Sequence, residues 1–120
     1  MRTRAQRVLA TFLLAGLSAA AFAADTPKAE RTGKEIAFDR SSGNCLACHA
    51  MPGVPDAISA GNIAPPLIAM KARYPDRAKL RAQIWDATVN NPQTSMPPFG
   101  KHKVLTEEEI DKVTDFIQGL

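Results

Sequence analysis

The chain has 120 residues, of which 45% are hydrophobic and 22% are charged, and this length suits a single domain. Its formal net charge of +3 equals the contribution of the arginines at positions 2, 4 and 7, so the remainder of the chain is balanced. That balance excludes a nucleic-acid partner attracted by overall charge, and no segment after the N-terminus is long or apolar enough to span a bilayer.

The N-terminus has the pattern of a secretory signal peptide. The early arginines form a basic start, residues 8–17 are apolar, and Ala21 and Ala23 are the small residues that a signal peptidase reads. An uncleaved membrane anchor is the alternative, but the apolar stretch is short for a span. We therefore expect a signal peptide at residues 1–23, export of the chain, and one domain at residues 24–120.

A short helix and a long loop are predicted for the first part of that domain. Residues 24–32 are polar and include Pro27, which indicates a loose N-terminal segment. Residues 33–39 favour a short helix with its apolar side chains near the middle. Residues 50–69 are rich in proline, glycine and alanine, a composition that forbids a long helix and suggests a loop wrapped around something else.

Two more helices follow. Pro75 suits a first helical position, and apolar residues recur at helical spacing after it, so we predict a helix over residues 75–89 and then a loop over residues 92–103. Residues 106–109 form a capping box that begins the last helix, and its buried stripe comprises Ile110, Val113, Phe116, Ile117 and Leu120. Since no strand or repeat is recognisable, the expected fold class is all-α.

The most informative motif is Cys45-Leu46-Ala47-Cys48-His49, which uses both cysteines of the chain. Two thiols at this spacing can add to the two vinyl groups of one haem, and the adjacent histidine can then ligate the iron. A redox-active dithiol is the first alternative, although the strand–helix pattern that usually surrounds one is absent. A zinc site with His102 is the second, although adjacent Cys48 and His49 would strain tetrahedral geometry. The motif predicts one covalently bound haem c.

The second axial ligand has to come from another part of the chain. Met96 is the leading candidate, because the two prolines after it would hold its thioether rigidly over the iron, and a thioether favours the ferrous state. Met70, His102 and an open position are the alternatives. For the ring of His49, the expected partner is the Pro65 carbonyl, since a ligating histidine donates its second N–H to such a group.

Charge is distributed unevenly in the second half of the chain. Residues 71–81 are strongly basic, and residues 107–115 are strongly acidic. Such runs are usually solvated helix faces, and the functional alternatives are pairing with haem propionates and docking to a charged redox partner.

An ordered set of short segments makes the resemblance more specific than a small cytochrome c. The chain closely resembles the SoxX family, the single-haem subunits of the SoxAX cytochromes of thiosulfate oxidation, from about Gly43 to the C-terminus. The matching segments are Gly43-Asn44-Cys45-Leu46-Ala47-Cys48-His49, Gly61-Asn62-Ile63-Ala64-Pro65-Pro66-Leu67, Tyr74-Pro75-Asp76, Asn91-Pro92, Met96-Pro97-Pro98-Phe99-Gly100-Lys101-His102 and Leu105-Thr106-Glu107.

This resemblance implies a class I cytochrome c fold, with short helices and loops around one haem, located in the periplasm. It implies that Cys45 and Cys48 hold the haem and that His49 and Met96 are its axial ligands. It further implies a heterodimer with SoxA, which carries the catalytic haem of L-cysteine S-thiosulfotransferase and joins thiosulfate to a cysteine of the SoxYZ carrier. The SoxX haem then passes electrons to a soluble cytochrome c.

Two other functions stay open at this point. A free-standing periplasmic electron carrier would use the same haem without a permanent partner. A ligand-binding or peroxidatic haem protein would need an open position at the iron. No acid, base or spare thiol in the chain indicates that it performs the sulfur chemistry itself.

Overall fold

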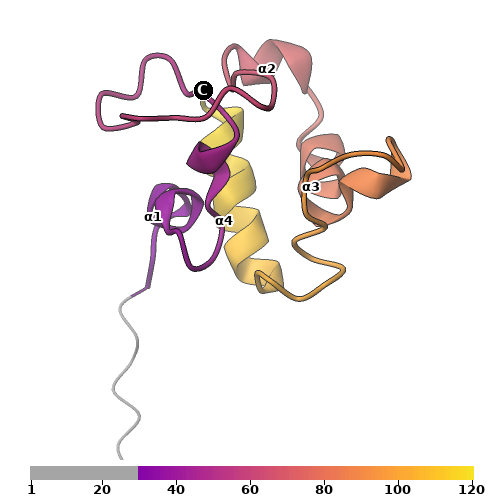
Figure 1. The fold of residues 1–120 in the computed structure, drawn as a ribbon. Helices are drawn as coiled ribbons and strands as arrows, with labels where there is room; N and C mark the ends of the chain where they lie inside the picture. The colour runs from indigo at the N-terminus through magenta and orange to yellow at the C-terminus, as the bar shows by residue number, and fades with distance from the viewer. Residues whose placement is uncertain (1–29) are drawn as a thin grey trace, which may run out of the picture.

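The computed structural model describes residues 30–120, which form a set of short helices and turns around one longer helix (Figure 1). The helices are α1 (Gly33–Phe38), α2 (Met70–Arg73), α3 (Arg77–Trp85) and α4 (Glu107–Gln118), with 3-10 turns at Cys45–Ala47 and Ala87–Val89. No strand occurs within residues 30–120, which confirms the all-α prediction. The expected signal peptide lies outside the described residues and stays a prediction.

Helix α4 forms the centre of the fold, with α1 and α3 packed against it (Figure 1). The predicted capping box is present: Thr106 Oγ1 accepts the Glu109 N–H at 3.1 Å, and Glu109 accepts the Thr106 N–H at 3.1 Å. The helix buries Ile110, Val113 and Ile117 along one face. Local signals and burial therefore agree on the same helix.

Removing this cap provides a test of how the central helix is stabilised. Thr106→Ala is expected to lower the free energy of unfolding by about 1 kcal/mol, because the Glu109 N–H loses its acceptor at the helix start. Thermal unfolding of the loaded protein would measure this loss. Thr106→Ser keeps the hydroxyl and is the matched control, so equal losses from both substitutions would contradict the capping role.

The start of the described chain is attached to the core. Thr32 caps α1 together with Glu35, and the Arg31 guanidinium donates to the carboxylates of Asp39 and Glu109. The expected loose segment at residues 24–32 lies mostly outside the described residues and stays a prediction. Within its described part, the Arg31 ion pairs connect residues 30–32 to α4 and to Asp39 at the end of α1.

Helix α3 is shorter than predicted. Asp76, rather than a residue before Pro75, is the N-cap, since its carboxylate accepts the Ala78 N–H at 2.8 Å. The helix ends at Trp85, and the rest of the predicted helix is the separate 3-10 turn at Ala87–Val89.

The basic and acidic runs face each other across α3 and α4. Arg77 pairs with Asp115 and Asp111, and Arg81 pairs with Asp111 at 2.7 Å and with Glu107. Much of the charge that could have served a partner is therefore used within the fold.

Helix α2 was not predicted, and contacts with the C-terminus hold it in place. The Met70 N–H donates to the Leu120 carbonyl at 3.2 Å, and the Gln118 side chain donates to the Tyr74 carbonyl at 2.9 Å.

No helix within residues 30–120 is both long and apolar enough to cross a membrane.

Candidate functional site

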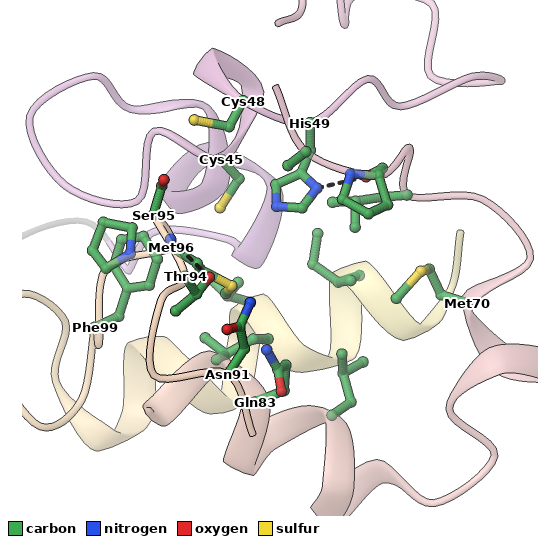
Figure 2. A pocket seen from close by; sticks show the side chains of 18 of the residues that line it. Cys45, Cys48, His49, Met70, Gln83, Asn91, Thr94, Ser95, Met96 and Phe99 are labelled. Carbon is green, nitrogen blue, oxygen red and sulfur yellow. Dashed lines mark hydrogen bonds between the residues drawn. The ribbon is translucent and has the colours of Figure 1, made fainter. Parts of the chain in front are cut away.

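A cavity of about 460 Å³ lies between the helices and the two long loops (Figure 2). This volume is within the range typical of sites for small molecules and cofactors. Residues from the motif turn, the residue 50–69 loop, the residue 92–103 loop and all helices except α1 contribute to its walls. Apolar side chains from the core form much of the lining, among them Leu67, Leu80, Ile84, Phe99, Leu105, Val113 and Ile117.

The two thiols lie on the cavity wall. Cys45 begins the 3-10 turn and Cys48 follows its last residue, so a tight turn brings both sulfurs to the same side. They form no disulfide, and burial raises the pKa of the Cys45 thiol to about 11. Redox-active cysteines have lowered pKa values, so this environment disfavours the dithiol alternative. Two thiols directed into a largely apolar cavity suit addition to the vinyl groups of a haem.

The zinc alternative has no support from the geometry. Within residues 30–120, no group of three or more histidine, cysteine, aspartate or glutamate side chains is arranged to hold a metal ion. His102 is exposed and does not line the cavity.

The ring of His49 is oriented by the Pro65 carbonyl, the partner expected from the sequence. Its Nδ1 lies 2.7 Å from the Pro65 carbonyl oxygen, which leaves the other ring nitrogen free on the cavity side (Figure 2). An imidazole fixed in this way is a suitable axial ligand, because the carbonyl sets its tautomer and raises its basicity.

Backbone hydrogen bonds bring Pro65 to this position. Two of them connect the loop to the motif, from the N–H groups of Gly61 and Ala64 to the carbonyls of Leu46 and Cys48, and a third runs from the Leu67 N–H to the carbonyl of Ala50, directly after the motif. The Ala64 N–H donates at 3.1 Å, so the methyl group of this residue does not keep the loop away from the motif. The next carbonyl, of Pro66, accepts a hydrogen bond from Arg73 at 2.8 Å.

Met96 enters the cavity from the residue 92–103 loop. Its N–H donates to Thr94 Oγ1 at 3.1 Å, and its thioether extends into the space below Cys45 in Figure 2. Since His49 and Met96 line the same cavity from different segments, a planar group between them could be ligated from both faces. This arrangement fits the donor set that a haem requires.

The loop that carries Met96 is fixed at its far end to α3. The Trp85 carbonyl accepts the N–H groups of Gly100 and Lys101 at 3.1 and 3.3 Å. Lys101 Nζ also pairs with the buried carboxylate of Asp86 at 2.8 Å, and this ammonium holds the pKa of Asp86 below its usual range.

Met70 is a weaker candidate for the axial position. It lines the cavity, but only 2% of it is exposed, and its sulfur accepts a hydrogen bond from Arg73 at 3.4 Å. Figure 2 shows it well separated from Met96, on the other side of the view.

Sequence reasoning missed several polar residues of the cavity. Gln83, Asn91, Gln93, Thr94 and Ser95 all line it, next to Met96 in the chain or on the facing helix. The polar run before Met96 was the available signal for most of them. Gln83 had none, because only the packing of α3 brings it to the cavity.

Known proteins resemble this chain over most of the described region. A family model described as cytochrome C oxidase, cbb3-type, subunit III matches residues 28–117. The solved structure of SoxXA from P. pantotrophus contains a chain that is 28% identical, with a TM-score of 0.65, and the match covers 72% of this chain and 77% of that one. With the helical fold described above, these matches confirm the class I cytochrome c fold and the resemblance to SoxX.

An uncharacterized lipoprotein of Aquifex aeolicus (strain VF5) is 35% identical over 75 residues. The match covers 62% of this chain but only 35% of the relative, so the chain spans about a third of that protein's length.

Proposed function

Because the chain belongs to the cytochrome c family described as cytochrome C oxidase, cbb3-type, subunit III, we propose that it is an electron-transfer protein with one covalently attached haem c. One observation carries the proposal. A single cavity brings together two thiols, a histidine oriented by a carbonyl, and a thioether on a separate loop. We assign Cys45 and Cys48 to the covalent attachment, and His49 and Met96 to the axial positions.

Each residue has a defined task in this proposal. The haem supplies an iron that exchanges one electron at a time. Pro65 fixes the imidazole of His49, and the backbone and ion-pair contacts of the Met96 loop limit how far the thioether can move. The apolar side chains of the walls would pack against the haem. Electron transfer of this kind needs no general acid, general base or free thiol, and both thiols of the chain are used by the attachment.

The finer proposal is that the chain is the SoxX-like subunit of a SoxAX complex, the L-cysteine S-thiosulfotransferase. A SoxA partner would perform the coupling of thiosulfate to the SoxYZ carrier cysteine, and this chain would pass the electrons to a soluble cytochrome c. The structural likeness to a SoxXA chain and the ordered sequence segments support this role. The basic and apolar N-terminal residues support export to the periplasm, and the lipoprotein relative agrees with a location outside the cytoplasm.

The first experiment tests the attachment. Protein purified from the periplasm is expected to have the mass of the mature chain plus one haem, and acid–acetone treatment should not extract the pigment. Replacing Cys45 and Cys48 together by serine, with His49 kept, should make the pigment extractable. Extraction from the unmodified protein would contradict the assignment.

The second experiment tests the partner. The chain alone is expected to show no thiosulfate-dependent reduction of cytochrome c, because the haem attachment would use both of its thiols. Addition of a SoxA subunit with its SoxYZ carrier should restore turnover. A chain that exchanges electrons with cytochrome c but never associates with a second haem subunit would instead be the free-standing carrier.

A further inference from the structure

Asp86 and Lys101 form an unusual ion pair at the end of the loop that carries Met96. The Asp86 side chain is 9% exposed, whereas the acidic partners in the α3–α4 network are between 44 and 68% exposed. Its carboxylate accepts from Lys101 Nζ at 2.8 Å, from the Thr88 N–H at 3.1 Å and from the Thr88 hydroxyl. A carboxylate buried in this way is costly unless every contact is kept, so the pair is sensitive to the loss of either partner.

The position of this pair gives it a specific consequence. Lys101 lies five residues after Met96, and the intervening residues include two prolines and the buried Phe99. The backbone of Gly100 and Lys101 is already bonded to Trp85 at the end of α3. A side chain on Gly100 would fall 2.0 Å from the Trp85 ring, so the loop lies directly against this helix.

We propose that Asp86 and Lys101 are positioning residues for Met96: their ion pair fixes the loop to α3 and so keeps the thioether at the iron. This inference rests on the proposed ligation by Met96. Neither side chain lines the cavity, and both would act through the loop backbone rather than by contact with the haem.

The proposal predicts a change in ligand exchange. In the oxidised loaded protein, added imidazole has to replace Met96, so its apparent affinity reports how readily the loop moves away. Asp86→Asn and Lys101→Gln are each expected to raise that affinity about tenfold or more, because each leaves a charged or buried partner unpaired. In the double variant, imidazole affinity should rise by much less than the product of the two single fold-changes, because the second substitution removes an interaction that the first has already broken.

Two controls separate positioning from general stability. Asp56→Asn breaks a more exposed ion pair, with Lys34 at 2.6 Å, at a place far from the Met96 loop in the chain, and it should leave imidazole affinity unchanged. Thr106→Ala destabilises α4 without touching the loop and should also leave it unchanged. Lys101→Arg keeps the positive charge, so its imidazole affinity should stay close to that of the unmodified protein. Lys101 is 56% exposed, so its variants should fold even if Asp86→Asn does not.

The outcomes distinguish this inference from the proposed function. Methionine ligation in the unmodified protein, with imidazole affinity unchanged in both Asp86→Asn and Lys101→Gln, would overturn the positioning role and leave the electron-transfer function intact. The positioning role would also be wrong if imidazole affinity changed in parallel with the free energy of unfolding across all variants. Covalent haem without methionine ligation in the unmodified protein would overturn both the ligand assignment and this inference.

Discussion

Replacing Met96 by alanine is expected to lower the reduction potential of the haem by on the order of a hundred millivolts or more, within the span of about 0.8 V that axial ligands cover. A thioether stabilises the ferrous iron, so its loss favours the oxidised state. The weak charge-transfer band of methionine-ligated ferric haem, at the red end of the spectrum, should disappear. The open position should then bind carbon monoxide in the ferrous protein.

Met70 supplies the matched control for this experiment. It is a second methionine on the same cavity, although more deeply buried than Met96, and Met70→Leu removes a thioether while nearly conserving volume. The charge-transfer band should survive in Met70→Leu, because the Met70 sulfur contacts Arg73 rather than the space between His49 and Met96. A band that survives Met96→Ala but is lost in Met70→Leu would reverse the two assignments. Bis-histidine spectra would move the sixth ligand to His102.

Helix α4 was predictable because its local and tertiary requirements coincide. The Thr106 capping box and the apolar stripe both come from neighbouring residues. The structure buries Ile110, Val113 and Ile117 of the predicted stripe and leaves Phe116 and Leu120 partly exposed. Helix α3 shows where local signals compete. Pro75 and Asp76 are both good starting residues, and the side chain of Asp76 decides between them by bonding to Ala78.

Other features depend on contacts that no local pattern contains. Helix α2 has only four residues, and its bonds are to Leu120 and from Gln118, far along the chain. The basic and acidic runs were visible in the sequence, but their mutual pairing depends on how α3 lies against α4. The Asp86–Lys101 pair likewise becomes visible only when the end of α3 and the Met96 loop are seen together.

The proposed haem donors differ from their structural support in how far the sequence can predict them. The spacing of Cys45, Cys48 and His49 predicts haem attachment from adjacent residues alone. Pro65 could be proposed because a proline-rich loop of that length can return under His49. What holds that loop against the motif was not predictable, because it depends on a close backbone approach at Gly61.

Gly61→Ala is expected to lower the free energy of unfolding of the loaded protein by about 1–3 kcal/mol or more. A Cβ atom at this position would lie 1.9 Å from the Ala47 carbonyl oxygen and 2.6 Å from its carbon. These are backbone atoms of the haem-binding motif and cannot rotate away as a side chain could. The loop therefore has to move outward, and the 2.8 Å hydrogen bond from Gly61 to Leu46 should be lost or lengthened. Chemical unfolding monitored through the haem absorbance would measure the change.

The same displacement of the loop should also change the reduction potential of the haem, because it acts on His49. Pro65 lies four residues after Gly61, and its carbonyl holds the ring at 2.7 Å, so an outward shift weakens that bond and lowers the basicity of the imidazole. A less basic ligand stabilises the ferric state less well, and the reduction potential should therefore rise. Gly119→Ala is the control, because its nearest contact would be 3.4 Å and its φ of −77° suits alanine. If both substitutions had equal effects on stability and potential, the loop would not be held by its approach to the motif.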